Sequence, residues 1–281
     1  MSILETVTSL ADVSELKDNQ IIGDIELRQS KVVFNGKGNI LIAPPSSVES
    51  TGVILENSTI SFNQSNSVTF LDSSKDKYFI NLSLFNNCFC YIGENNYFNG
   101  ILTMQCSEHS NIIIGDSCMF SSGIWIRTSD VHLIYDVETH QRVNYSKSVF
   151  IGDHVWIGQD AKLWKGTKIG SGSILGADSF TTGKTIPSNT AWGGNPAKQI
   201  RDGVFFVRAI SVHAFTVVET KASREYPYDE GVFKFDENET IDFTDFERAI
   251  TTYTQAEERA VFLHEFSKSK WKNRFYINEA P

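Results

Sequence analysis

Histidine is the side chain best suited to moving a proton near neutral pH, and three of the six histidines, His132, His140 and His154, lie close together in the sequence. Asp130 and Asp136 flank His132. Either carboxylate could hold its imidazole by the second ring nitrogen and so fix the tautomer. This group could supply a general base. The alternative is a surface histidine between aspartates that only shape turns.

Trp156 is the second candidate for a chemical role. Its indole N–H is a hydrogen-bond donor and never an acceptor, which suits a carbonyl, a developing oxyanion or a sugar oxygen. In the six-residue register described next, Trp156 takes the last place of its unit and should point outward. It could instead be buried beneath a loop or at a contact between subunits.

A repeat of six residues over 151–180 sets the elements that must position these side chains. The first place of each unit is Ile or Leu, and the fifth is small or β-branched. A period of six fits neither an α-helix nor a continuously alternating strand. It fits short strands with a corner after each, the parallel β-helix, whose interior the aliphatic residues would fill. The first places hold Ile151, Ile157, Leu163, Ile169 and Leu175, and the fifth hold Val155, Ala161, Thr167, Ser173 and Ser179.

The same register predicts a long loop between two coils. It recurs upstream, slips by four residues just before Ile114, and reaches Ile126. From Ile126 to Ile151 the chain takes 25 positions where one unit needs six, so about 19 residues should leave the coil, roughly 131–149. A long loop extruded from a regular solenoid is usually functional, and His132 stands at the start of this one.

Composition divides the chain into three parts. Residues 1–30 are expected to be a short helical or mixed lead-in. Residues 31–203 should form the β-helix, which ends in a turn-rich segment, GKTIPSNTAWGGNPAKQIRDG. Residues 204–281 are rich in aromatic residues, and one stretch repeats apolar residues at three- and four-residue steps, typical of helix. We expect this mixed, partly helical extension to pack on the coil or on a neighbouring subunit.

Charge and composition exclude several classes of protein. Acidic residues outnumber basic ones by 34 to 25, which argues against a nucleic-acid partner. No apolar run approaches the length of a membrane span, and the N-terminus does not resemble a secretory signal, so we expect a cytoplasmic protein. The segment KSKWKNRFYI is either a solvated helix end or a contact for an anionic polymer or the inner membrane surface. The four cysteines, which lack zinc-type spacing, should be reduced and buried: Cys88, Cys90, Cys106 and Cys118.

The repeat and its ending resemble a known family. VWIGQDAKLWKGTKIGSGSILGADS followed by TIPSNTAWGGNPAKQIR is similar to the end of the hexapeptide-repeat acyltransferases. RTSDVHLIYDVETHQRVN followed by SVFIGDHVWIG resembles the bacterial capsule O-acetyltransferases that modify polysialic acid. The resemblance covers about 90–201 and is absent from 204–281. It implies a left-handed parallel β-helix, a homotrimer, and transfer of acetyl groups from acetyl-CoA.

The resemblance also implies roles for single residues. His132 would be the general base that takes the hydroxyl proton, and Trp156 would be its partner across a cleft between subunits. The pantetheine arm of CoA would pass small residues, and its phosphates would meet cations. Glycines at corners and lysines on an exposed face are, however, what any β-helix needs. The cofactor candidates are Gly158, Gly176, Ala177, Lys184, Lys198 and Arg201.

Four residues near His132 in the sequence are candidates for binding the acceptor: Trp125, Arg127, Tyr135 and Arg142. Aromatic faces stack on sugars, and arginine pairs with carboxylates such as that of sialic acid. The resulting hypothesis is an acetyl-CoA-dependent O-acetyltransferase acting on a bacterial surface saccharide of a capsule or lipopolysaccharide. Transfer would be direct, since no activated Ser or Cys is evident.

Other functions remain open. The chain could be an N-acetyltransferase of an amino sugar or a drug, or a β-helical scaffold without catalysis. The β-helix fold also hosts a carbonic-anhydrase class with three histidine ligands. The close pair of histidines typical of that class is missing here, since His132, His140 and His154 are separated by 8 and 14 residues, so we expect no metal.

Overall fold

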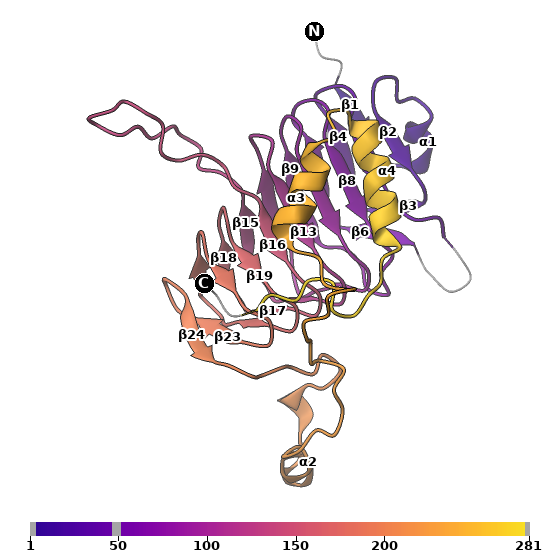
Figure 1. The fold of residues 1–281 in the computed structure, drawn as a ribbon. Coiled ribbons are helices and arrows are strands. Elements are labelled where there is room, and N and C mark those ends of the chain that lie inside the picture. The colour runs from indigo at the N-terminus through magenta and orange to yellow at the C-terminus, as the bar shows by residue number, and fades with distance from the viewer. Residues whose placement is uncertain (1–3, 47–51, 279–281) are drawn as a thin grey trace.

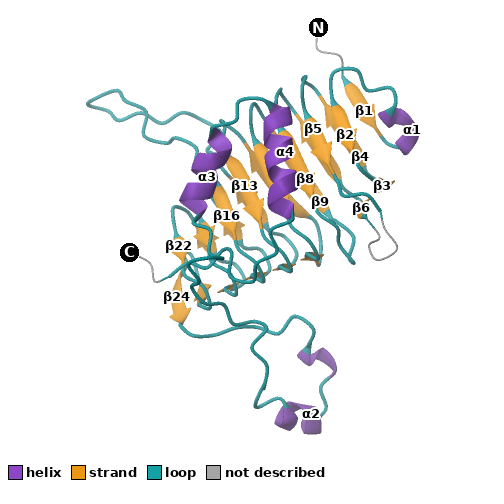
Figure 2. Cartoon of the chain, turned by 45° about the vertical axis from the view of Figure 1, so that its right-hand side comes forward, coloured by secondary structure: helices purple, strands orange, loops and turns teal. Residues whose placement is uncertain are grey.

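The computed structural model describes residues 4–46 and 52–278. Most of them form a β-helix whose strands stack into three large sheets, one along each face of a three-sided prism, with a separate two-stranded sheet near the N-terminal end (Figures 1 and 2). We call these sheets face A, face B and face C, in the order in which the chain visits them. Within each face the stacked strands run parallel, except for one antiparallel pair at an end of face A and one at an end of face C. The β-dominated fold and the parallel β-helix predicted from the hexads are confirmed, and so is the left hand that the resemblance implied.

The strands of the three faces have the following bounds. Face A contains β1 (Glu5–Val7), β4 (Lys31–Phe34), β7 (Thr59–Phe62), β9 (Ile80–Leu84), β12 (Leu102–Cys106), β15 (Trp125–Arg127), β18 (Lys162–Leu163) and β21 (Phe180–Thr181). Face B contains β2 (Gln20–Ile22), β5 (Ile40–Ile42), β8 (Val68–Leu71), β10 (Phe89–Ile92), β13 (Asn111–Ile114), β16 (Val149–Ile151), β19 (Lys168–Ile169) and β22 (Thr185–Ile186). Face C contains β11 (Tyr97–Phe98), β14 (Met119–Phe120), β17 (Trp156–Ile157), β20 (Ile174–Leu175), β23 (Ala191–Gly193) and β24 (Lys198–Arg201).

The strand register gives the length of each coil. Lys162 pairs with Phe180, 18 positions later, which is three hexads. Trp125 pairs with Lys162, 37 positions later, so 19 additional residues leave the coil between β15 and β16, as the hexads predicted. The bounds shift slightly, because β15 ends at Arg127 and β16 begins at Val149. We call residues 128–148 the arm.

The first coils begin earlier than the sequence suggested. β2 pairs in parallel with β5, and β3 (Ile25–Arg28) pairs in parallel with β6 (Val53–Glu56). Residues 20–28, assigned above to a lead-in, therefore belong to the solenoid. Only β1 and the short helix α1 (Leu10–Val13) precede these strands within the described residues.

The interior of the prism is filled by the first-place aliphatic residues. Ile157 has no exposed surface and packs in one continuous core with its counterparts from the other hexads. Ile157→Ala should lower the free energy of unfolding by about 2–5 kcal/mol, because it removes buried methyl groups and leaves a cavity between stacked coils. Chemical denaturation measures the change. Ile210→Ala, at a half-exposed position outside this core, is the matched control and should have little effect.

The C-terminal extension covers face B. Its helices α3 (Phe243–Thr251) and α4 (Ala256–Ser267) lie against the outer side of that sheet (Figure 2). There Phe150 stacks on Phe243, and Tyr91 meets Phe266 edge to face. A shared apolar cluster of helix and strand residues joins the two layers, so burial of this apolar face holds the helices in place. No helix among the described residues is long and apolar enough to span a bilayer.

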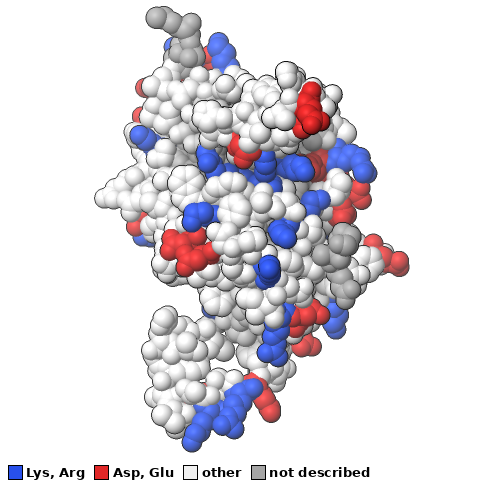
Figure 3. Space-filling view, turned by 90° about the vertical axis from the view of Figure 1, so that its left-hand side faces the viewer, with Lys and Arg blue, Asp and Glu red and all other residues white. Residues whose placement is uncertain are grey.

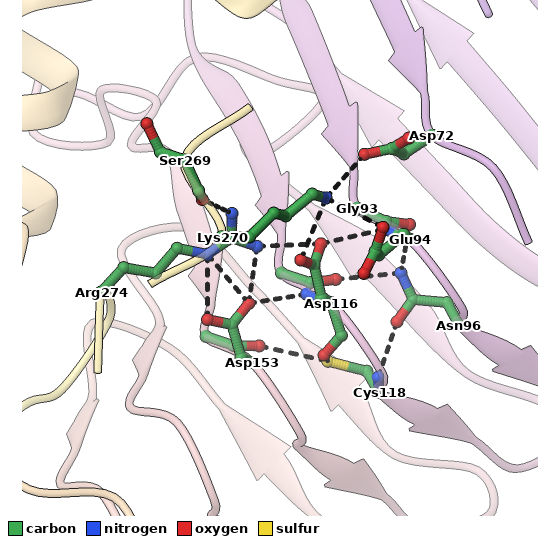
Figure 4. A network of polar contacts seen from close by, with 12 residues as sticks. Asp72, Gly93, Glu94, Asn96, Asp116, Cys118, Asp153, Ser269, Lys270 and Arg274 are labelled. Carbon is green, nitrogen blue, oxygen red and sulfur yellow. Dashed lines mark hydrogen bonds and ion pairs between the residues drawn. The ribbon is translucent and has the colours of Figure 1, made fainter. Parts of the chain in front are cut away.

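A row of carboxylates fixes the end of this extension (Figure 4). Asp72, Glu94, Asp116 and Asp153 follow successive strands of face B, one in each coil. Lys270 binds the first three, with Nζ–O distances of 2.9, 3.3 and 3.2 Å.

Arg274 completes this cluster from inside the molecule. It is 1% exposed and donates to Asp153 at 2.8 Å and 3.0 Å and to Asp116 at 2.8 Å. Burial alone would lower the pKa of Arg274, but the two carboxylates raise it above its usual value. The run KSKWKNRFYI is therefore not a solvated helix end: Lys270 and Arg274 hold the extension on the β-helix.

Candidate active site

The arm leaves the prism at the corner between face A and face B and extends far from it (Figure 1). Its tip is a hairpin, with a bridge between Tyr135 and Arg142 and a hydrogen bond from the Asp136 amide to the Gln141 carbonyl at 2.9 Å. Tyr135, predicted to bind the acceptor, thus lies on the arm and is largely exposed.

Two ion pairs anchor the base of the arm. Arg142 donates hydrogen bonds from both of its terminal nitrogens to the Glu108 carboxylate, at 2.7 and 2.8 Å. Lys165 donates to Asp130 at 2.5 Å, and this hydrogen bond lowers the pKa of Asp130. Arg142 was predicted to pair with a sugar carboxylate, but in this chain its guanidinium already has a carboxylate partner.

His132 lies on the arm with an exposed side chain. Asn144 fixes its backbone by donating to the His132 carbonyl at 2.8 Å, and the same amide donates to Asp130 at 3.0 Å. Asp136 accepts instead from the backbone and hydroxyl of Thr139, at 2.8 and 2.9 Å. The side-chain carboxylates of Asp130 and Asp136 therefore bind other groups and not the His132 ring.

Trp156 points outward from face C, as its place in the hexad predicted, and its side chain is partly exposed. Its stacking neighbours in the sheet are Met119 and Ile174. The corner that carries the arm is the one corner of the prism that face C does not touch. His132 and Trp156 therefore lie on opposite sides of one chain.

His154 has a structural role. Its ring stacks on Phe206 with centroids 4.2 Å apart, and its Nε2 lies 3.0 Å from the Phe206 carbonyl oxygen. Burial lowers the pKa of His154 and so favours the neutral ring. Among residues 4–46 and 52–278, no three His, Cys, Asp or Glu side chains gather closely enough to hold a metal ion.

Three of the six cofactor candidates share one corner, between face C and face A. A Cβ on Gly158 would stand 2.4 Å from the Ala177 amide nitrogen and 2.7 Å from the Gly176 carbonyl carbon. Close stacking of coils therefore requires glycine at position 158, whatever else it does. Ala177, on the next coil, is exposed. The result is a column of small residues beside Trp156.

The three cationic residues predicted to bind CoA do not lie together within a single chain. Lys198 and Arg201 lie exposed on β24, the last strand of face C. Lys184 lies between β21 and β22, at the corner of the arm. The side of the molecule that carries the arm shows a band of Lys and Arg across its middle (Figure 3).

Trp125 and Arg127 lie on the outer side of face A. The Arg127 guanidinium stands 5.9 Å from the ring centres of both Trp125 and Trp164 and donates to Gln105 at 2.9 Å. Trp164 was not among the residues predicted for the site. The available signal was its side chain, which is large for an outward position in a hexad.

Sequence reasoning also missed a groove of about 900 Å³ on the outer side of face C. One wall is the sheet, including Tyr97 and Trp156. The other wall is residues 205–226, which have no hexad register and so gave no signal. This segment contains the short helices η1 (Val212–Ala214) and α2 (Val217–Ala222).

Comparisons with known proteins agree with this geometry. The family model "Bacterial transferase hexapeptide (six repeats)" matches residues 148–183. The chain is 32% identical over 108 residues to a polysialic acid O-acetyltransferase of Escherichia coli O1:K1 / APEC, a match that covers 38% of this chain and 34% of that protein. It is 43% identical over 68 residues to the polysialic acid O-acetyltransferase of Neisseria meningitidis, covering 24% and 31%. The matched segments thus span about a third of the length of these curated relatives.

Two solved structures extend the likeness over more of the chain. The structure of the polysialic-acid-specific acetyltransferase NeuO superimposes with a TM-score of 0.58 and 30% identity, covering 68% of this chain and 88% of that one. The polysialic acid O-acetyltransferase OatWY superimposes with a TM-score of 0.50 and 23% identity, covering 74% and 96%, which shows the fold alone. With its hexad repeat, its three-faced prism and its extruded arm, the chain belongs to the hexapeptide-repeat acyltransferase family.

Proposed function

We propose that this protein is an acetyl-CoA-dependent O-acetyltransferase that modifies a hydroxyl group of a bacterial surface saccharide. The observation that carries the proposal is the pairing of an arm that presents His132 with a sheet face that presents Trp156 beside a column of small residues. The names of the relatives support a saccharide acceptor. We assign the reaction to the cytoplasm, where acetyl-CoA is produced.

The active site is assembled from two copies of the chain. His132 and Trp156 lie on opposite sides of one prism, so the arm of one copy must reach face C of its neighbour. The arm carries apolar side chains that are largely exposed in the single chain, such as Leu133 at 56%, Ile134 at 52% and Val143 at 60%. A neighbouring copy would cover this apolar surface. Three copies arranged around an axis would form three equivalent sites.

The reaction requires no covalent enzyme intermediate. The His132 imidazole takes the proton of the acceptor hydroxyl while the hydroxyl oxygen attacks the thioester carbonyl carbon. The Trp156 N–H donates to the oxyanion that forms, and such a donor is worth about 10²–10³-fold in rate. The carbon–sulfur bond then breaks, and the CoA thiolate receives the proton from the imidazolium. The products are an acetyl ester and free CoA.

The cysteines support direct transfer. Cys88, Cys90, Cys106 and Cys118 are all buried inside the prism. Burial raises the pKa of Cys90, Cys106 and Cys118, so these thiols stay protonated. A hydrogen bond with the Cys106 thiol lowers the pKa of Cys88, but Cys88 has no exposed surface and so does not reach a substrate.

The donor would pass the corner formed by Gly158, Gly176 and Ala177, where the exposed Ala177 presents only a methyl group to the narrow pantetheine arm. Lys198 and Arg201, at the end of face C, would meet the phosphates of CoA. Lys184 lies at the corner that carries the arm, so it would meet the phosphates of a CoA molecule bound on face C of a neighbouring copy.

Oligomeric state gives a direct check of the shared site. Light scattering at working concentration should give a particle of three times the chain mass of 31.6 kDa. Deletion of the arm tip, residues 133–143, should weaken this assembly because it removes the exposed apolar contact. A stable monomer with full activity would contradict the shared site.

The activity itself is tested by incubation of the protein with acetyl-CoA and a panel of neutral, acidic and amino-bearing glycans, followed by mass spectrometry. We expect one or more acetyl groups on a glycan hydroxyl, released by mild base as an ester. Acetylation confined to amines would replace the proposal by an N-acetyltransferase. An oligomer that modifies no glycan and does not bind CoA would point to a scaffold.

A further inference from the structure

We propose that residues 205–226 and face C together form the acceptor subsite, and that this subsite takes a neutral saccharide rather than a sialylated one. This inference rests on the proposed function and specifies its acceptor. It concerns a segment that lies outside the hexad repeat.

The segment is fixed at both ends by one residue, Asn189. The Asn189 carbonyl accepts from the Val204 amide at 2.9 Å. Its side chain donates to the Gly231 carbonyl at 3.2 Å and accepts from the Phe233 amide at 3.1 Å. The chain between these anchors leaves the prism and returns, with α2 at its far end (Figure 1). The excursion is therefore held in place at its base.

Two contacts hold the near part of the segment against face C. The Phe206 ring stacks on His154 and lies 5.8 Å from the Trp156 ring. Arg208 donates to Asp76 at 2.9 Å and to the carbonyl of Asn95. The wall formed by the segment is thus aligned with the side chain proposed to contact the reacting carbonyl.

The groove between this wall and the sheet has the features of a sugar site. Its volume of about 900 Å³ falls in the range of ligand pockets and exceeds the size of one sugar ring. Tyr97, Trp156 and Tyr226 offer aromatic faces for the apolar side of a sugar ring. Amide and hydroxyl groups in the lining suit sugar hydroxyls: Asn99, Ser121, Ser211 and Ser223.

The groove also connects with the donor column. Trp156 lies in the groove, and Gly158, two residues later, begins the column of small residues at the next corner. An acceptor in the groove and a thioester in the column would therefore meet at Trp156. This arrangement assigns the two substrates to opposite sides of one indole.

Charge selects among saccharides. A sugar carboxylate is bound most strongly by a cation that is free to pair with it, but the Arg208 guanidinium in this groove is bound to Asp76. Apart from the tyrosines, the lining has two other titratable side chains: His213, which is a base, and Glu225, which is an acid. Outside the groove, Arg142 on the arm is bound to Glu108, and Arg127, on the outer side of face A, donates to the Gln105 side chain. A hydroxyl-rich, uncharged sugar matches this balance.

The test uses single ring deletions in the full-length protein. Tyr97→Ala and Tyr226→Ala should each raise the KM for a neutral oligosaccharide by about tenfold, with an unchanged KM for acetyl-CoA and an unchanged unfolding temperature. Tyr97→Phe should keep the wild-type KM because the ring remains. Tyr228→Ala is the matched control, since Tyr228 is exposed on the same excursion and meets the Tyr226 ring edge to face but does not line the groove.

The possible outcomes are distinct. If the wild-type protein acetylates only acidic glycans, or if Tyr97→Ala and Tyr226→Ala behave like Tyr228→Ala, this inference is overturned while the proposed function stands. A rise in the KM for acetyl-CoA alone would assign the groove to the donor. A loss of oligomer mass in both variants would assign it to a second copy of the chain. If no glycan hydroxyl is acetylated, the proposed function itself fails.

Discussion

Replacing His132 by asparagine should lower turnover by about 10²–10⁴-fold, the usual contribution of a positioned general base. The substitution should leave the unfolding temperature unchanged, because the His132 ring is exposed on the arm. The loss is measured as the steady-state rate at which the acetylated glycan forms from acetyl-CoA and the glycan acceptor. The KM for either substrate should change little, since the lost interaction belongs to the transition state.

His140→Asn is the matched control for this experiment. His140 lies on the same arm and is also exposed, with a backbone φ of 54° that asparagine tolerates well. Its replacement should leave turnover near the wild-type value. Wild-type turnover in the His132 variant, or an equal loss in both variants, would remove His132 from the chemistry.

Replacing Arg274 by methionine should lower the free energy of unfolding by about 3–5 kcal/mol. The side chain is 1% exposed, and its loss would leave the Asp153 carboxylate buried without its cation. The docked end of the C-terminal extension would then be loosened. Chemical denaturation followed by circular dichroism measures the effect.

Two further variants separate this cause from a general loss of packing. Arg248→Met removes an exposed ion pair with Asp245 and should cost at most about 1 kcal/mol. Asp153→Asn combined with Arg274→Met should recover part of the stability, because no uncompensated charge remains. Equal destabilisation by Arg248→Met and Arg274→Met would show that the buried cluster contributes little.

Much of the prism could be predicted because its signal is local. Each hexad specifies one strand and one corner, so the spacing from Ile126 to Ile151 was enough to give the length of the arm. The ion pairs that hold the C-terminal extension on the β-helix could not be predicted in this way. Arg274 and Asp153 are 121 positions apart, and nothing periodic in the extension relates it to a given coil.

The site was only partly predictable for a related reason. His132 and Trp156 are near each other in the sequence, but a coil turns two corners between them. The flanking aspartates looked like partners of His132, yet Lys165, on the next coil, binds Asp130, and the hairpin turn binds Asp136. These pairings depend on how coils stack, which spacing along the chain does not reveal.

The shared active site is tested most directly by mixing two inactive chains. His132→Asn lacks the proposed base, and Trp156→Ala lacks the proposed donor. When the two chains are co-expressed in equal amounts and mix at random, a working site needs His132 from one chain and Trp156 from its neighbour. About a quarter of all sites, and one of the three sites in each mixed trimer, should therefore regain activity. Mixed oligomers, purified through two different tags, that show no more activity than either parent would contradict the account.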